Sequence, residues 1–361
     1  MRVVNEGGAG ARRPRATHYN PAMLIVLPGA LPASPPIADE LAKRLPTTAP
    51  TLHAWLRAAD ASVLAFDPHD AGCTSYEAWQ LEQAGFRSAP GQQVGAGLGP
   101  LLARAGRAPG SDPAAPVLAA SDAAAATADP APVWIADLTH VALSTESANL
   151  LPVEALGLTA EEDAALFAAA APLFEGTGFS AHSLAPGRWR VRLPADLHPI
   201  TASPAAVGGQ SLSGWWNQDG ALRPWRRLMN EIQMVWHDHP VNEARAARGL
   251  PPVNTLWLYG GATPWAAMPA TATTPPPQVI EDLLPAFTAE DWGTWLNALQ
   301  QMDARVFKPL SDPRGLPTQA VELLLLGRDR QVNLTLKPRS RLLGWLPSSA
   351  KNWSAWWSPR A

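Results

Sequence analysis

One segment of the 361-residue chain constrains the fold more than any other, and it runs from Leu222 to Ala262. It begins with apolar residues at helical spacing, which predict a helix over 225–237 with one buried face. Pro240 fits the first turn of a second, short helix, where its missing N–H is not needed, and Gly249 is placed to end that helix. Residues 254–259 predict a strand, so the segment should fold as helix, helix and strand.

Polar side chains that can bind a ligand are concentrated in this segment. Asn230, Gln233 and His237 recur three and four residues apart on one face of the first helix. Arg245 on the second helix can hold a phosphate or carboxylate with two parallel hydrogen bonds, and the glycines let backbone N–H groups approach a ligand. The candidate ligand-binding residues are Asn230, Gln233, His237, His239, Asn242, Arg245, Asn254, Gly260 and Gly261.

Other roles for the same residues compete with ligand binding. His237 and His239 can chelate a metal if both imidazoles converge on it. Alternatively, Asp238 or His239 can cap the second helix by accepting from its first-turn N–H groups. The amides of the first helix can bond to nearby backbone, and Arg245 can form an ordinary ion pair. The sequence leaves these alternatives open.

Charge and cysteine content exclude several classes of partner. The formal net charge is -3, and the 28 basic residues form no long run that could follow a phosphate backbone, so nucleic-acid binding is not expected. Cys73 is the single cysteine, which excludes an internal disulfide and a cysteine cluster for zinc, and which suits a cytoplasmic location. No stretch approaches the roughly 20 apolar residues of a membrane span. No cofactor is expected.

A change of composition divides the chain. Residues 106–129 are dominated by Ala, Pro, Ser and Asp and have little to bury, which is typical of a loosely ordered connection. Beyond it, alternating residues over 132–143, a capping box from Thr159 to Glu162 and a hairpin over 179–193 predict a small α+β lobe. We therefore expect a disordered extension at 1–20, an α/β body formed by 21–126 and 201–361, and an α+β lobe at 127–200.

Three further features concern the body. Residues 23–27 predict a buried strand that ends in a loop at Pro28-Gly29, which is where α/β sheets place ligands. The glycine-rich residues 91–100 lack the strand, glycine and lysine order of a phosphate-binding loop, and they predict a simple connection. Most of the 16 tryptophans lie in the C-terminal half and favour core and rim packing, with a homo-oligomer or protein-partner contact through that half as the alternative.

The pattern HDHPVNEARAARGLPPVNTLWLYGG, preceded by MNEIQM, resembles the RpfE-type regulatory protein family, which is related to the archaeal type of cofactor-independent phosphoglycerate mutase. The resemblance extends upstream to WIAD at 134–137 and PGRW at 186–189. It implies an alkaline-phosphatase-like or phosphoglycerate-mutase-like α/β body, in reduced form, with a small α+β lobe.

The same resemblance implies what the protein does. Mutases of that type place a metal-binding aspartate where this chain has Pro28, and they need late histidine ligands, whereas no histidine follows His239. The resemblance thus implies a mutase-like protein without the metal-dependent phosphoryl-transfer site, which binds an anionic small molecule or a partner in a regulatory role. The alternatives are a protein-interaction module and an active mutase or phosphohydrolase with relocated ligands, such as His237, His239, Asp67 and His69.

Overall fold

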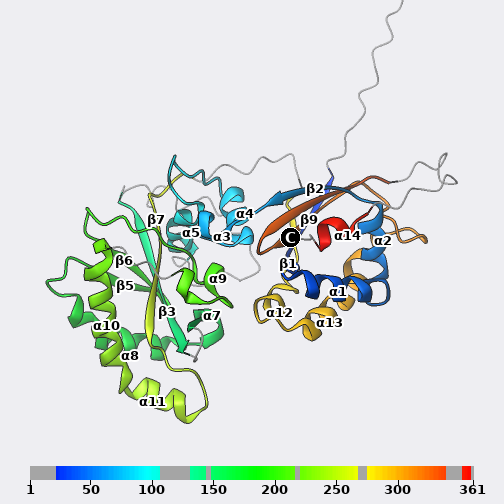
Figure 1. Ribbon diagram of the computed structural model, residues 1–361. Helices are drawn as coiled ribbons and strands as arrows, with labels where there is room; N and C mark the ends of the chain where they lie inside the picture. Colours follow the sequence, from blue (N-terminus) through cyan, green and yellow to red (C-terminus); the bar gives the residue numbers. More distant parts are fainter. Residues whose placement is uncertain are drawn as a thin grey trace, which may run out of the picture.

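The computed structural model describes residues 22–105, 131–143, 148–215, 220–266, 275–338 and 352–358. It is a mixed α/β molecule with two five-stranded sheets, and the ribbon shows them in two lobes side by side (Figure 1). We call the described residues within 22–65 and 275–358 the first lobe, and those within 66–266 the second lobe. The expected extension at 1–20 and the connection expected at 106–129 lie outside the described residues.

The sheet of the first lobe has the strand order β2, β10, β9, β1, β8. β1 runs parallel to β8 and β9, whereas β10 is antiparallel to both β9 and β2. The turn between β9 and β10 therefore joins two neighbouring antiparallel strands. The bounds of the strands are β1 (Met23–Leu31), β2 (Asp60–Ala65), β8 (Gln278–Val279), β9 (Val321–Gly327) and β10 (Arg330–Leu336).

The helices of the first lobe share one core on one face of this sheet. Both crossovers, from β1 to β2 and from β8 to β9, connect parallel strands and move across the sheet in the same direction. Because such crossovers are right-handed, they place their helices on the same face. The crossover helices are α1 (Pro35–Thr48), α2 (Pro50–Ala58), α12 (Leu284–Thr288) and α13 (Trp292–Met302), which continues in a π-helical turn at Asp303–Phe307. The short α14 (Ser354–Trp357) follows β10 and joins the same core.

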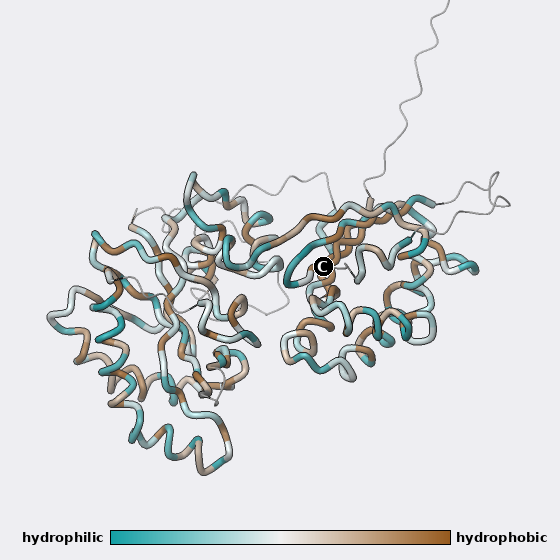
Figure 2. Tube along the Cα trace, viewed as in Figure 1, coloured by the Kyte–Doolittle hydropathy of each residue, from teal (hydrophilic) through white to brown (hydrophobic). Residues whose placement is uncertain are grey.

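Tryptophans of the C-terminal half pack into this core. Trp295 and Trp357 are buried, and Trp357 Nε1 donates to the Ala38 carbonyl at 2.9 Å. The helix α14 is held by Arg330, which donates to the carbonyls of Trp356 and Trp357. Figure 2 shows hydrophobic residues along the strands that these indoles cover. Core packing thus accounts for both of these indoles.

The first strand continues past Pro28-Gly29, where a loop was expected. β1 pairs with β9 as far as Pro28 and again at Leu31, with a register shift between them. Gly29 adopts a φ of 73°, which a side chain would strain, and its carbonyl accepts from Trp295 Nε1 at 2.8 Å. The Pro-Gly pair is therefore a bulge within a buried strand.

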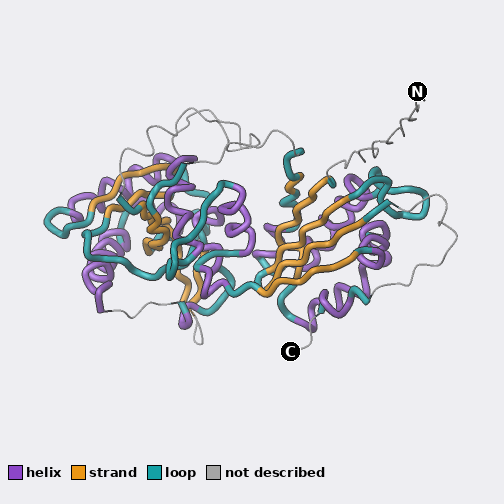
Figure 3. Tube along the Cα trace, turned by 90° about the horizontal axis from the view of Figure 1, so that it is seen from above, coloured by secondary structure: helices purple, strands orange, loops and turns teal. Residues whose placement is uncertain are grey.

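The sheet of the second lobe contains β3 (Val133–Leu143), β4 (Ala148–Leu151), β5 (Ser180–Ala185), β6 (Arg188–Arg192) and β7 (Thr255–Ala262). Figure 3 shows its strands apart from those of the first lobe. β7 pairs with β3 along its length, so a strand that we expected in the body belongs to the sheet begun at 133. Residues 127–200 are accordingly not seen as a separate lobe. The sequence could not show this, because the alternation within β7 does not specify which strand lies beside it.

Helices cover both faces of the second sheet. One face carries α8 (Ala160–Ala170), α10 (Arg223–His237) and α11 (Pro240–Ala247), and the other carries α4 (Ser75–Gln83) and α5 (Leu98–Ala105). Within the described ranges, each helix is too short or too polar to span a bilayer. Single turns complete the lobe at α3 (Pro68–Ala71), α7 (Val153–Leu156), α9 (Pro204–Val207), Val94–Gly97, Ala171–Phe174, Leu212–Gly214 and Gly220–Leu222.

The glycine-rich residues 91–100 end in a helical turn and the start of α5, where we expected a simple connection. A Cβ atom on Gly99 would lie 1.9 Å from the Val133 carbonyl oxygen and 3.4 Å from the Cα of Gly260. Glycine is needed here because α5 packs directly on the backbone of β3 and β7. These glycines serve close packing of a helix on a sheet.

Candidate functional site

Arg245, the expected anion anchor, is fully buried and bonded to protein groups. Its Nη1 donates to Glu162 Oε2 at 2.8 Å, its Nε to the Pro251 carbonyl at 2.9 Å, and its Nη2 to the Leu156 carbonyl at 2.7 Å. Glu162 belongs to the capping box of α8, so the guanidinium joins α11 to α8 and to the chain that leads into β7. This geometry gives Arg245 a structural role in the second lobe.

Asn242 closes the loop between α10 and β7. Its Nδ2 donates to the carbonyls of Trp236 and Val253 at 2.7 and 2.8 Å, and its Oδ1 accepts from the Val253 N–H at 2.8 Å. Both ends of the buried amide are thus satisfied by backbone groups. The side chain fixes the return of the chain toward β7.

Asn254 and His239 also bond to nearby backbone. Asn254 accepts from the Val141 N–H at 2.8 Å and donates to the Val141 carbonyl at 3.0 Å, which ties β7 to β3. His239 is the N-cap of α11, and its Nδ1 accepts from the Val241 N–H at 3.2 Å. The capping alternative for His239 is therefore the one that the structure displays.

The polar row of α10 faces solvent. Asn230, Gln233 and His237 are all exposed on the outer face of the helix, opposite the residues that pack on the sheet. The structure does not bring the row together with the buried residues of α11 and β7.

The residues considered as relocated metal ligands are also separated. His69 stacks on Trp215 with ring centroids 3.7 Å apart, whereas His237 is the last residue of α10 and His239 caps α11. Asp67 caps α3 by accepting from the His69 N–H. Among the described residues, no three His, Cys, Asp or Glu side chains form a group that could hold a metal ion.

Gly260 and Gly261 have positive φ angles of 102° and 104°. A Cβ on Gly260 would lie 2.9 Å from the Val133 carbonyl oxygen, and one on Gly261 would lie 2.4 Å from the indole of Trp134. We expected another group to approach the backbone of this glycine pair closely. The backbone and side chains of β3, within the protein, make this approach.

A buried ion pair crosses the second sheet. Arg188 Nε and Nη2 donate to the two carboxylate oxygens of Asp137, each at 2.8 Å, and the Tyr259 hydroxyl donates to the same carboxylate at 3.0 Å. Arg188 also reaches the exposed Glu154 at 3.0 Å. Burial, together with the Asp137 charge, raises the pKa of Tyr259 well above its ordinary value, so the phenol remains a donor. The cluster joins β3, β6 and β7.

Cys73 lies under the same sheet and is buried. Burial, together with the carboxylate of Glu77, raises the pKa of its thiol. A thiol of raised pKa forms little of the nucleophilic thiolate at neutral pH. The structure therefore gives no support to Cys73 as a nucleophile.

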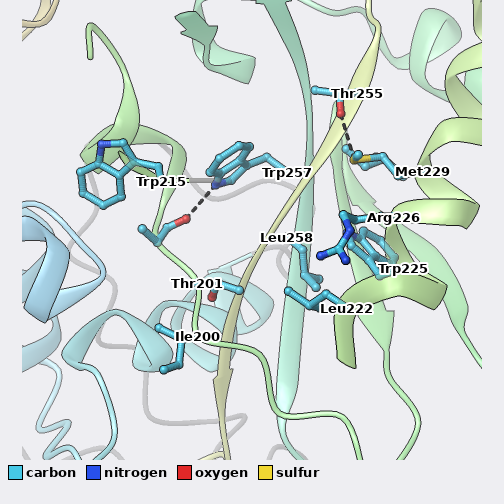
Figure 4. A pocket seen from close by; sticks show the side chains of 12 residues that line it. Ile200, Thr201, Trp215, Leu222, Trp225, Arg226, Met229, Thr255, Trp257 and Leu258 are labelled. Atoms are coloured by element: carbon cyan, nitrogen blue, oxygen red, sulfur yellow. Dashed lines mark hydrogen bonds between the residues drawn. The ribbon is translucent and has the colours of Figure 1, made fainter. Parts of the chain in front are cut away.

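A pocket lies against the edge of β7 (Figure 4). Four consecutive residues of this strand line it, and because alternate side chains point to opposite faces, such a pocket must border the edge of the strand. In the described part of the chain, β7 pairs with β3 alone, so this edge is not used by another strand. The pocket is open to solvent, and it is lined by Ile200, Thr201, Ala202, Trp215, Leu222, Trp225, Arg226, Met229, Thr255, Leu256, Trp257 and Leu258.

Indole rings and one guanidinium dominate this lining. Trp257 is fixed by a hydrogen bond from its Nε1 to the Ala202 carbonyl at 2.8 Å, and Trp215 is fixed by its stacking on His69. Figure 4 shows the Arg226 side chain on the side of α10 that faces β7. Sequence reasoning missed this pocket, although Arg226 and Met229 stand three residues apart, a spacing that places both on one helical face.

Comparison with known proteins gives limited information. No protein-family profile matches the chain, and no curated protein matches it. Among solved structures, a cofactor-independent phosphoglycerate mutase from Thermoplasma acidophilum is 12% identical, with a TM-score of 0.33 and coverage of 92% of this chain and 94% of that one. The PH0037 protein from Pyrococcus horikoshii is 12% identical, with a TM-score of 0.38 and coverage of 92% of both chains. TM-scores below 0.5 do not establish a shared fold.

Proposed function

We propose that this protein binds an anionic small molecule that carries a flat ring, in the pocket at the edge of β7, and that it acts as a regulatory binding protein. The observation that carries the proposal is the lining, which combines three indoles with the guanidinium of Arg226. Small-molecule sites are mostly apolar clefts in which a few polar groups fix orientation. This pocket has that composition.

The indoles specify the apolar part of the ligand. Trp215, Trp225 and Trp257 line the pocket with rigid rings, and aromatic rings prefer offset or edge-to-face contact with other rings. Trp215 and Trp257 are held in place by His69 and by the Ala202 carbonyl, so they lose little freedom when a ligand binds. A planar ring fits these walls better than a flexible chain.

Arg226 specifies the charge of the ligand. A guanidinium stays protonated at all physiological pH values and matches the geometry of a carboxylate or phosphate. The threonine hydroxyls of Thr201 and Thr255 add polar groups to the same lining, although Thr255 donates to Met229 Sδ at 3.2 Å. Among the lining residues that the structure describes, none carries a carboxylate that would repel an anion.

Binding is proposed in preference to catalysis. The described lining contains no histidine, cysteine, aspartate or glutamate that could serve as a general base or a nucleophile. The relation to phosphoglycerate mutases and to RpfE-type regulatory proteins is part of the proposal, and it rests on the sequence of 222–262. No observation in the described residues favours relocated metal ligands.

The test compares three probes by calorimetric titration of the full chain. Naphthalene-2-carboxylate has both a ring and a charge, 2-naphthol has the ring without the charge, and 3-phosphoglycerate has the charge without the ring. We expect the carboxylate to bind at least about tenfold more tightly than either of the others, because only it uses both features of the lining. Stronger binding of 3-phosphoglycerate, or no measurable heat with any probe, would contradict the proposal.

A further inference from the structure

The edge strand β2 is exposed along its whole length. All six residues from Asp60 to Ala65 are exposed, and Val63 and Leu64 are 50% and 61% exposed. Among the described strands, β2 pairs only with β10, so its outer edge presents a row of backbone donors and acceptors. Apolar side chains beside such an edge are the signature of a strand that pairs with another chain.

The helical layer of the first lobe stops short of this edge. Val63 lies opposite Val332, which is buried under the helices, so both point to the helix-covered face. Val63 is nevertheless half exposed, which shows that α1 and α2 do not overhang β2. Leu64 lies opposite Gln331 and points to the other face. A strand from another chain that pairs with the outer edge of β2 therefore meets no helix on either face of the sheet.

β2 also lacks the features that normally protect an edge. Its sequence, DASVLA, contains no proline, no lysine and no glycine, and its pairing with β10 has no register shift. Edge strands that remain single usually carry such residues or a bulge. Apart from the charge of Asp60 at its first position, nothing within the strand discourages the addition of a further strand.

We infer that β2 pairs antiparallel with β2 of a second copy of this chain, so that the two sheets of the first lobes form one continuous sheet. An antiparallel strand is self-complementary across a twofold axis. With the axis at Val63, this residue lies opposite its own copy and Ser62 lies opposite Leu64, so Asp60, at the end of the strand, does not face its own copy. The Val63 side chains of the two copies meet on one face of the joined sheet, and the two Leu64 side chains lie near each other on the other face.

The test measures the mass of the full chain by sedimentation velocity between about 1 and 100 µM, a range in which a dimer of micromolar affinity is visible. The wild type is expected to change from monomer to dimer over this range. Leu64→Lys places like charges near the axis and is expected to weaken association at least about tenfold. Lysine at an exposed position leaves the fold intact, which circular dichroism checks.

Met234→Lys is the matched control, because Met234 is also a large exposed side chain, at 75%, but lies on α10 in the second lobe. We expect this variant to associate like the wild type. A wild-type chain that stays monomeric at 100 µM, or a dimer that Leu64→Lys leaves unchanged, would overturn the inference. Equal loss of association in both lysine variants would also overturn it, because the effect would then not be specific to β2.

Discussion

Replacing Arg245 by alanine is expected to lower the free energy of unfolding by about 3–5 kcal/mol, the usual range when one partner of a buried ion pair is removed. Arg245 has no exposed surface, and its three bonds go to Glu162 and to the carbonyls of Leu156 and Pro251. The variant leaves both carbonyls without this donor in a buried environment, which costs stability in addition to the lost ion pair. Denaturant titration with a fixed m-value measures the change.

Arg248→Ala is the matched control for this prediction. Arg248 contacts the same Glu162 carboxylate, but its side chain is 52% exposed, so its loss should cost less than about 1 kcal/mol. If Arg245→Ala were as stable as the control and yet impaired binding of anionic probes, Arg245 would be a ligand anchor and our structural assignment would fail.

The second large effect is expected for Asp137→Ala, again about 3–5 kcal/mol of unfolding free energy. The carboxylate of Asp137 is buried and accepts two bonds from Arg188 and one from Tyr259. Its removal leaves a guanidinium and a phenol without their common acceptor at the junction of β3, β6 and β7. Thermal and denaturant unfolding should both show the loss.

Glu154→Gln provides the comparison for Asp137. Glu154 contacts the same Arg188, but its side chain is 68% exposed, and surface ion pairs contribute less than about 1 kcal/mol. A stability loss in Glu154→Gln as large as that in Asp137→Ala would show that the exposed arm of the network, and not its buried part, holds the strands together.

The ends of several helices could be predicted from the sequence because the signals that set them are local. Pro240 marks the first turn of α11, Gly249 follows it with a positive φ, and the capping box of Thr159 and Glu162 begins α8. Each signal acts within one turn of the chain, where steric limits and capping hydrogen bonds decide the structure.

The long-range partners of the polar residues could not be predicted, whereas the capping by His239 is local and was among the alternatives that the sequence offered. Arg245 meets a carboxylate 83 residues away, and its carbonyl acceptors are equally invisible in the sequence. A buried arginine and a ligand-binding arginine look the same until their neighbours are known. The expected site residues therefore divide into buried groups that bond to the protein and exposed groups on α10.

The pairing of β7 and the pocket were missed for a related reason. The apolar alternation of β7 predicts a strand but does not select β3 as its partner. The pocket combines that strand with Arg226 and with Ile200 to Ala202, which come from different parts of the chain. The spacing of apolar residues on α10 predicted which face of the helix is buried. It did not predict that residues at the border of this face line a pocket.

Titration of naphthalene-2-carboxylate into the wild type, Arg226→Gln and Arg227→Gln tests the central claim most directly. Arg227 is the adjacent residue, but it is exposed and paired with Glu231, so its replacement removes the same charge outside the pocket. The account predicts that Arg226→Gln weakens binding at least about tenfold, as expected for loss of a charge-assisted hydrogen bond, while Arg227→Gln binds like the wild type. Equal affinity in Arg226→Gln and the wild type would contradict the assignment of the pocket as an anion-binding site.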